Sequence, residues 1–283
     1  MFELKWKNKS LDLSSPVVMG ILNLTPDSFY DGGKNKGLNN AIQCAEKMID
    51  EGAAIVDIGA VSTKPNATEV SVEEEWDRLK DVLKHLRVNF PDTILSVDTY
   101  RASIARRAAD FGTDMINDIS GGQFDDLMFA TIAELQLPYV MMHIQGTPAN
   151  MQESPAYNDV VREVNAFFKT QLSKLTLLGV TKNIILDPGF GFGKTVGHNY
   201  ELLRRFSEFK KLGYPLLAGL SRKSMINKVL GIQADDALNG TAVLNTIALL
   251  NGANILRVHD VKEAVEAINL LKNIQYPILN VES

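Results

Sequence analysis

The sequence has a single cysteine and no long apolar run, and each shortage excludes a class of protein. Cys44 cannot form an intramolecular disulfide, and its place in the helical pattern AIQCAEKMI predicts a packed thiol. No apolar run approaches the ~20 residues that span a bilayer, and the amino-terminal MFELKWKNKS lacks the apolar stretch of a signal peptide. The sequence therefore predicts a cytoplasmic protein without a membrane partner.

Clustered basic residues and common catalytic signatures are also missing. The chain has 29 Lys and Arg against 34 Asp and Glu, a net charge of −5, and no basic stripe, which argues against nucleic acid and favours small-molecule partners. We find no Cys/His or carboxylate cluster with metal-ligand spacing and no Gly-x-Ser-x-Gly motif. We therefore expect neither a resident metal nor covalent catalysis, although Mg²⁺ can arrive with a diphosphate ligand.

A repeated pattern of short apolar runs predicts the fold. Eight runs are bounded by Gly, Pro, Asn or Asp, at 17–24, 54–60, 94–99, 115–120, 139–143, 184–189, 215–221 and 255–260. Segments between them, such as VEEEWDRLKDVLKHL (72–86), have apolar residues at helical spacing. This alternation predicts an α/β fold, a (β/α)8 TIM barrel over 17–273, rather than an open doubly wound sheet. We expect one domain, residues 1–283, with a short β-hairpin over 1–14 capping the barrel's lower end.

Polar residues follow most of the predicted strands. They are Asn23, Asp57, Asp98, Asn117, His143, Asp187, Ser221 with Arg222 and Lys223, and Arg257 with His259. In a (β/α)8 barrel the active site lies at the carboxyl ends of the strands, so these side chains predict a binding rim. Asp57 and His143 are interpreted as structural, because an isolated polar group at a strand end can simply bond neighbouring backbone.

The carboxylates and the amide of this rim predict the kind of ligand. Asp98, Asn117 and Asp187 suit a flat heterocycle with several N–H donors and a carbonyl, because carboxylates accept paired hydrogen bonds and a carboxamide both donates and accepts. A pterin or guanine edge fits this pattern.

The cations of the rim indicate an anionic group on the same ligand. Lys223, Arg257 and His259 come from the last two strands, where barrels frequently hold phosphate, so they suit an anionic tail or a leaving group. The alternative is that they are surface cations of a loop.

The stretch DPGFGFGKT (187–195) ends like a phosphate-binding P-loop but does not fit that motif. Pro188 occupies the position five residues before Gly193 that requires glycine, and VGHNYELL delays the following helix. The glycines instead permit close backbone approach, which leaves Phe190 and Phe192 either to line a pocket for an aromatic substrate or to pack in the core.

Six motifs together resemble the dihydropteroate synthase family. They are GILNLTPDSFYDGG (20–33), SVDTYRA (96–102), MINDISGG (115–122), ILDPGFGFGK (185–194), LAGLSRKSMI (217–226) and ILRVHDV (255–261). The resemblance covers residues 17 to about 270 in the family's order. It implies that 6-hydroxymethyl-7,8-dihydropterin diphosphate and 4-aminobenzoate are joined into 7,8-dihydropteroate with release of diphosphate. It also implies a (β/α)8 fold, Mg²⁺, a homodimer and sulfonamides as possible inhibitors.

The resemblance also implies roles for individual residues. The pterin would be held by Asp98, Asn117, Asp187 and Lys223, with Arg257 beside its ring. The diphosphate would be held by Asn23, Arg257 and His259, and Asn23 would also bind Mg²⁺. The aminobenzoate pocket would be bordered by Phe192 and Ser224, with Phe29 and Pro65 from two mobile loops. Asp98 and Asp187 would stabilise a cationic methylene formed by SN1-like loss of diphosphate, while a closed loop excludes water. The neutral arylamine needs no strong general base.

The stretch VDIGAVSTKPNAT (56–68) departs from the family's usual Ser-Thr/Ser-Arg-Pro-Gly. Thr63, Lys64 and Pro65 would lie on a substrate loop above the rim, and Lys64 is expected to pair with Asp31 or with an anionic substrate group in the catalytic site. An ammonium keeps the charge of Arg but loses its planar fork, and Asn66 restricts the turn less than most residues would.

Two other functions remain open from sequence. One is a pterin-binding methyltransferase barrel, against which the Asn23 loop and SRKS (221–224) favour diphosphate chemistry. The other is a catalytically weakened, antifolate-tolerant pterin-binding protein.

Overall fold

Eight parallel strands form the centre of the molecule. The computed structural model describes residues 2–24, 34–62 and 70–275. The sheet has the order β8-β7-β6-β5-β4-β3-β10-β9, and a parallel bridge between Leu186 and Leu216 joins its two edges into a barrel. The strands are β3 (Val17–Asn23), β4 (Ile55–Gly59), β5 (Ile94–Asp98), β6 (Met115–Asp118), β7 (Tyr139–Met142), β8 (Ile184–Asp187), β9 (Leu217–Ala218) and β10 (Ile255–Val258). The predicted strands and (β/α)8 fold are thus confirmed, although the seventh run forms a strand of only two residues.

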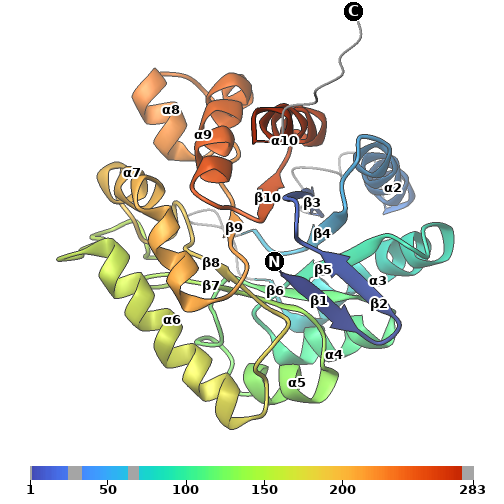
Figure 1. Ribbon diagram of the computed structural model, residues 1–283. Coiled ribbons are helices and arrows are strands. Elements are labelled where there is room, and N and C mark those ends of the chain that lie inside the picture. Colours follow the sequence, from blue (N-terminus) through green and yellow to red (C-terminus); the bar gives the residue numbers. More distant parts are fainter. Residues whose placement is uncertain (1, 25–33, 63–69, 276–283) are drawn as a thin grey trace, which may run out of the picture.

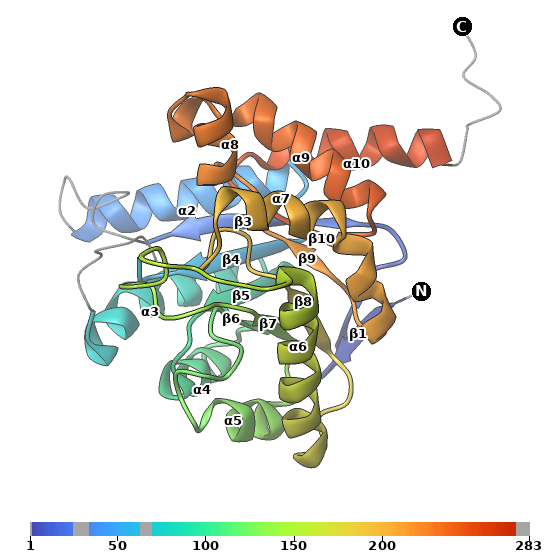
Figure 2. The same cartoon turned by 90° about the vertical axis from the view of Figure 1, so that its left-hand side faces the viewer.

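Helices surround the strands on the outside of the barrel (Figures 1 and 2). They are α2 (Lys34–Asp50), α3 (Val72–Asn89), α4 (Ala102–Asp110), α5 (Met128–Leu135), α6 (Val160–Leu177), α7 (Val196–Arg204), α8 (Ser224–Leu230), α9 (Leu238–Leu250) and α10 (Val261–Gln275), with 3-10 turns η1 (Phe206–Leu212) and η2 (Ala234–Asp236). Local sequence sets their starts: Ser71 accepts a hydrogen bond from the Glu74 amide, and acidic residues fill the first turn of α3. No helix in the described ranges is long and apolar enough to cross a membrane.

The predicted amino-terminal hairpin closes the lower end of the barrel. Strands β1 (Glu3–Trp6) and β2 (Lys9–Asp12) pair antiparallel. Their buried Leu4, Trp6 and Leu11 pack against the first apolar residues of the barrel strands. This hairpin removes the interior apolar side chains at that end from water, so the opposite end is the one left for ligands.

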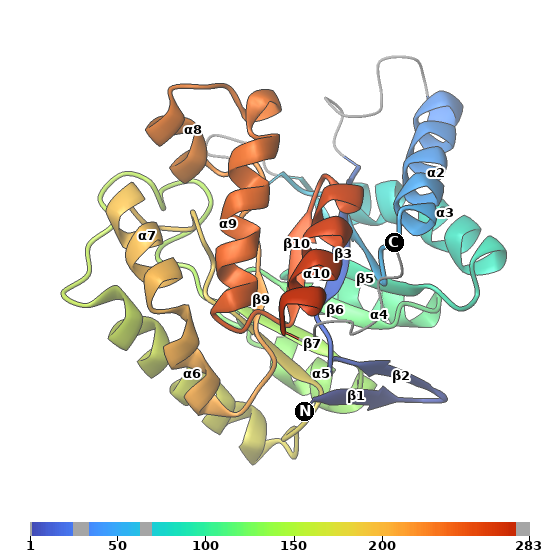
Figure 3. The ribbon, with the colours of Figure 1, turned by 45° about the horizontal axis from the view of Figure 1, so that its top comes forward.

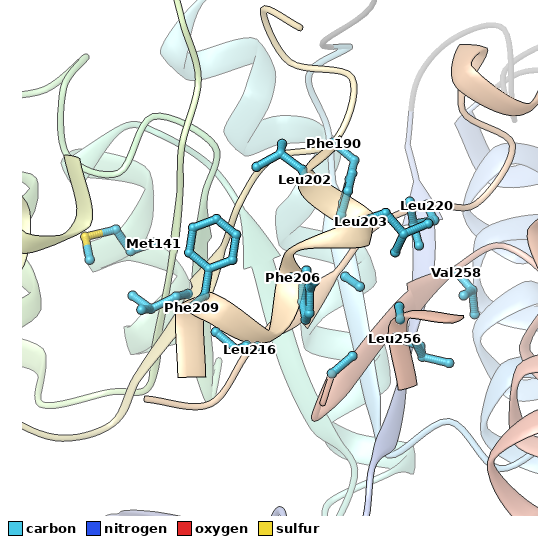
Figure 4. Close-up of a cluster of buried hydrophobic side chains, with 14 of the residues drawn as sticks. Met141, Phe190, Leu202, Leu203, Phe206, Phe209, Leu216, Leu220, Leu256 and Val258 are labelled. Atoms are coloured by element: carbon cyan, nitrogen blue, oxygen red, sulfur yellow. The ribbon is translucent and has the colours of Figure 1, made fainter. Parts of the chain in front are cut away.

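A cluster of aromatic and aliphatic side chains fills the space between α7, η1 and the strands (Figure 4). Phe190 is buried there and stacks on Phe206 at 6.0 Å between ring centroids, and Phe206 in turn meets Phe209 edge to face. The alternative of core packing is therefore the one that holds for Phe190, which anchors the segment after β8 from the outside of the barrel.

Strand register brings several of the polar strand ends to one level. Gly59 pairs with Asn23 on one side and with Asp98 on the other, and Asp98 pairs with Asn117. A Cβ atom at Gly59 would lie 3.4 Å from the Asp98 Cβ and 3.7 Å from the Asn23 Oδ1. Glycine therefore leaves between these two side chains a volume that a Cβ atom would fill at ordinary contact distances.

Candidate active site

Arg257 lies between two carboxylates at the carboxyl end of the barrel. Its Nε donates to the Asp57 Oδ2 at 2.6 Å, and its Nη2 donates to the Asp98 Oδ2 at 2.8 Å. The Asp57 side chain is fully buried, and those of Asp98 and Arg257 are 16% and 18% exposed. This pairing orients the guanidinium across the mouth of the barrel, with one edge held from below.

Asp57 also orients the amide of Asn117. The Asn117 Nδ2 donates to the Asp57 Oδ2 at 2.9 Å. An amide oxygen facing this carboxylate would be repelled, so the Asn117 Oδ1 is turned away from Asp57 and remains an acceptor for a ligand. Asp57 therefore binds two predicted site residues, Asn117 and Arg257, rather than neighbouring backbone as the sequence suggested.

Burial changes the protonation of the carboxylates. Burial, opposed by the Arg257 guanidinium, raises the pKa of Asp98 to about 7. Burial likewise raises the pKa of Asp187, opposed by the hydrogen bond that its Oδ1 accepts from the Gly189 amide at 2.7 Å and by the charge of Lys223. Both carboxylates sit in a site that disfavours an uncompensated anion, and a ligand that brings N–H donors or positive charge relieves that cost.

Lys223 and Phe192 form one wall of the site. The Lys223 Nζ lies 4.2 Å from the centroid of the Phe192 ring, a cation–π contact. Burial and the nearby Arg257 lower the pKa of Lys223 to about 8. Gly191 makes this approach possible, because a Cβ there would be 3.3 Å from the Lys223 Cδ. Phe192 is 9% exposed, against 1% for Phe190, and packs in a separate small cluster with Ile144 and Met151. With Lys223 over its ring, Phe192 rather than Phe190 stays the candidate for contact with an aromatic ligand.

His259 lies near the end of β10, bonded to Ser221. Its Nδ1 is 3.0 Å from the Ser221 Oγ, which also accepts from the His259 amide at 3.2 Å. Burial, with Arg222 and Arg257 nearby, lowers the pKa of His259 to about 4, so the ring is neutral near pH 7. Arg222 is paired with Asp260 at 2.7 Å. His259 therefore offers a neutral donor rather than a cation to an anionic ligand.

The structure brings most of the predicted site residues together at one end of the barrel. Asn23, Asp98, Asn117, Asp187, Arg257 and His259 lie at or next to strand ends, Lys223 precedes α8, and Ser224 is the exposed first residue of α8. Phe29, Asp31, Thr63, Lys64 and Pro65 lie outside the described residues.

Two contacts in this region were missed by the sequence argument. One is the contact of Asp57 with both Asn117 and Arg257. Asp57 lies two residues before the end of β4, and because side chains alternate along a strand, this position could have indicated an inward-facing side chain. The other is Lys194, which lies buried beside His143. Rejecting the P-loop removed the only motif that assigned Lys194 a role.

Comparisons with known proteins agree with this geometry. A family model described as pterin binding enzyme matches residues 19–259. The chain therefore belongs to the pterin binding enzyme family. Dihydropteroate synthase of Escherichia coli is 47% identical over 264 residues, 93% of each chain.

Solved structures of dihydropteroate synthases share the fold. The Yersinia pestis enzyme with a sulfonamide drug complex superposes with a TM-score of 0.91 at 43% identity, covering 97% of this chain and 99% of the other. The Xanthomonas albilineans enzyme in complex with 7,8-dihydropteroate superposes with a TM-score of 0.86 at 34% identity, covering 96% and 98%.

Proposed function

We propose that this chain is a dihydropteroate synthase, which joins 6-hydroxymethyl-7,8-dihydropterin diphosphate to 4-aminobenzoate and releases diphosphate. The observation that carries the proposal is the group of acceptors formed by Asp98, Asn117 and Asp187 around one mouth of the barrel, with Lys223 as a donor beside them. That pattern complements the amino, ring N–H and carbonyl groups of a pterin. The relative solved with 7,8-dihydropteroate supports it.

The buried carboxylates favour departure of diphosphate. As the pterin–methylene bond to diphosphate breaks, positive charge develops on the methylene and spreads into the ring. Positive charge beside Asp98 and Asp187 favours their ionised forms, whose pKa burial has raised, and in this site kept from bulk water the ionised carboxylates stabilise the developing charge more strongly than exposed ones do. The aminobenzoate nitrogen then attacks the methylene with its lone pair and loses a proton to solvent, in an SN1-like substitution. A concerted displacement in isotope-effect and positional isotope exchange measurements would contradict this step order.

The departing diphosphate meets donors from the last strand. Arg257 presents its guanidinium to the mouth of the barrel, and the neutral His259 ring can donate to a phosphate oxygen. Asn23 offers a neutral oxygen at the same level as Asp98. Mg²⁺ that arrives with the diphosphate would be held by phosphate oxygens, with the side-chain oxygen of Asn23 as its ligand from the protein. When bound, Mg²⁺ neutralises charge on the leaving group.

The aminobenzoate lies against the Phe192 and Ser224 side of the pocket. Phe192 gives an apolar face, and the exposed Ser224 hydroxyl at the start of α8 can donate to the carboxylate of the aminobenzoate. Sulfonamides that mimic aminobenzoate would compete for this place. The relative solved with a sulfonamide supports that inhibition.

The functional unit is a homodimer formed through α9 and α10, which lie side by side outside the barrel (Figure 3). Val243, Ile247 and Leu250 follow one another at helical spacing on α9 and remain 51%, 36% and 62% exposed, and Leu270 and Ile274 on α10 are 68% and 75% exposed. Apolar side chains gathered on neighbouring helices indicate a protein interface. Sedimentation of Val243→Glu beside wild type checks it, and an unchanged dimer would rule out this face.

A coupled assay for diphosphate release tests the activity. Release should require both the pterin diphosphate and 4-aminobenzoate, and 7,8-dihydropteroate should appear in equal amount. Absence of release with any pair, alongside tight pterin binding, would favour a binding-only protein. Methyl transfer from methyltetrahydrofolate would favour the methyltransferase alternative.

The same assay tests the substrate loop. Steady-state constants of Lys64→Arg and Lys64→Ala are compared with wild type. If Lys64 meets an anionic substrate group or Asp31, Ala weakens the reaction and Arg preserves it. Unchanged constants for Ala would remove Lys64 from the site.

A further inference from the structure

Lys194 is a buried ammonium surrounded by hydrogen-bond acceptors. It is 3% exposed. Its Nζ lies 2.9 Å from the carbonyl oxygens of Gly189 and Phe192, 3.3 Å from the carbonyl oxygen of His143 and 3.0 Å from the His143 Nδ1. Burial and the Lys194 charge keep the pKa of His143 well below its usual range, so the ring is neutral and Nδ1 accepts with the proton on Nε2.

This set of partners matches the charged form of the amine. An ammonium has three N–H donors for these acceptors, whereas a neutral amine has two donors and turns its lone pair toward another lone pair. Burial lowers the pKa of Lys194 to about 7, against the opposing negative charge of Asp187. The acceptors around the Nζ match the protonated form that this carboxylate favours. The ammonium therefore donates to the backbone carbonyls at this contact and to the His143 Nδ1.

The bonds of Lys194 join two loops at the carboxyl end of the barrel. His143 directly follows β7, and Gly189 and Phe192 belong to the segment after β8. These loops touch so closely that a Cβ at Gly189 would be 2.0 Å from the His143 carbonyl oxygen, and one at Gly193 would be 2.3 Å from the Gln145 carbonyl oxygen. Both glycines have positive φ, 70° and 62°. Carbonyl groups crowd at this contact, and Lys194 supplies the donors that hold it together.

The contact between the two loops also includes Phe192, whose ring lies against Lys223 in the candidate site. The carbonyl of Phe192 is bound by Lys194, and the ring of Phe192 carries the Lys223 ammonium at 4.2 Å. A shift of the Phe192 backbone therefore moves both the apolar face and the cation of the site. Displacements near 1 Å in such positions can reduce turnover about 100-fold.

We propose that Lys194 is a positioning residue that holds Phe192, and through it Lys223, in the geometry used for substrate binding. The identity of the substrates rests on the proposed function, but the positioning itself does not. A P-loop lysine binds the oxygens of a phosphate, whereas Lys194 binds carbonyl oxygens of the protein's own backbone.

The test compares Lys194→Met, Lys194→Gln and Phe192→Leu with the control Lys182→Met, an exposed lysine before β8. We expect Lys194→Met to lower kcat/KM for 4-aminobenzoate about 10- to 100-fold. Gln keeps two donors, so its loss should be smaller, and the control should match wild type. Because Lys194 acts through Phe192, the Lys194→Met/Phe192→Leu double variant should lose at most about 3-fold more than the worse single variant.

A crystal structure of the Lys194→Met protein separates this proposal from the proposed function. The Phe192 ring should move so that the Lys223 Nζ leaves the ~6 Å range of a cation–π contact. If Met does not fold, the Gln variant is used for both measurements. An unmoved ring, or losses that multiply in the double variant, would overturn the positioning role even in an active enzyme. If the wild-type protein has no synthase activity but the Phe192 ring is displaced in the Lys194→Met variant, only the proposed function is overturned.

Discussion

The two ends of the barrel each hold a buried cluster of carboxylates and cations, but the clusters differ in how completely they are paired. At the lower end, Asp114 accepts from Trp6 Nε1 at 3.3 Å, from Lys9 Nζ at 3.1 Å and from the Leu95 amide at 3.1 Å, and it also binds Arg87. Arg87 spends its other donors on backbone carbonyls, including that of Pro91 at 2.7 Å. Every charge there has several partners.

The upper cluster is left incomplete. Within the described part of the chain, the Asp57 Oδ1 is buried without a hydrogen-bond partner, and Asp98 has a pKa raised to about 7 by burial. A buried polar group without a partner costs about 1–3 kcal/mol, so this end is under electrostatic cost that ligand binding can relieve. The comparison teaches that the same residue types stabilise the fold at one end and prepare a site at the other.

Removing a carboxylate from the upper cluster should have the largest effect on activity. Asp187→Asn keeps an acceptor for the Gly189 amide but removes the negative charge, so we expect kcat/KM to fall at least about 100-fold, as for loss of one electrostatic partner of a transition state. The melting temperature should hold or rise, because a buried charge is removed. Steady-state kinetics and thermal unfolding check both, with the exposed Asp92→Asn as control. A large loss of stability would contradict this prediction and show that Asp187 stabilises the fold, as Asp114 does at the lower end.

Opening the lower cluster should have the opposite result. Arg87→Met leaves Asp114 with less charge compensation, so the free energy of unfolding should fall by about 2–3 kcal/mol while kcat/KM of the folded protein is unchanged. Urea unfolding measures the loss. The matched control is Arg106→Met, which breaks only the surface pair with Glu134 and should cost under about 1 kcal/mol. A change in kinetics with unchanged stability would contradict the division between the two ends.

The upper cluster should also make stability depend on pH through Asp98. Its folded pKa of about 7 lies above the ordinary 3.8, so between these values the folded state binds more protons than the unfolded state and stability falls as pH rises. His259, with its pKa lowered to about 4, acts in the opposite direction below about pH 6.5. His259 is present in both wild type and Asp98→Asn, so its contribution cancels in the difference between their free energies of unfolding. This difference should fall by about 1 kcal/mol per pH unit from pH 5 to 7. A flat difference would show that Arg257 keeps Asp98 ionised throughout.

The smallest effect is expected from the exposed member of the lower cluster. The Lys9 side chain is 30% exposed, and Asp114 retains Arg87, Trp6 and the Leu95 amide without it. Lys9→Met should therefore cost under about 1 kcal/mol in urea unfolding. A loss as large as that of Arg87→Met would show that the lower cluster is less completely paired than its contacts indicate.

Periodic signals made the fold predictable, and positional signals indicated which polar residues lie at the carboxyl end of the barrel. Parallel strands buried on both faces read as short apolar runs, and Asp98, Asn117 and Asp187 were predicted to bind a ligand because they lie at or within one residue of a strand end. The hairpin was visible from its alternation. The two residues of β9 were harder to bound, because the run around them also fits a buried loop.

Pairwise contacts were not available to that argument. Nothing in the order of residues says that Asp57 meets Arg257 200 positions away, or that Lys194 turns inward to His143. Phe190 and Phe192 have the same local signal, and only the three-dimensional packing separates Phe190, which stacks on Phe206 of η1, from Phe192, whose ring contacts Lys223. Such choices depend on three-dimensional contacts between distant segments.

Gly59, placed between Asn23 and Asp98, reserves volume rather than supplying chemistry. A methyl group there would meet only ordinary contact distances, the nearest being 3.4 Å to the Asp98 Cβ, so the backbone would accept alanine. The added carbon would enter the room between the side chains proposed to bind the pterin and the diphosphate. Substitution of Gly59 by alanine would therefore reduce the volume for a ligand without altering any charge in the site.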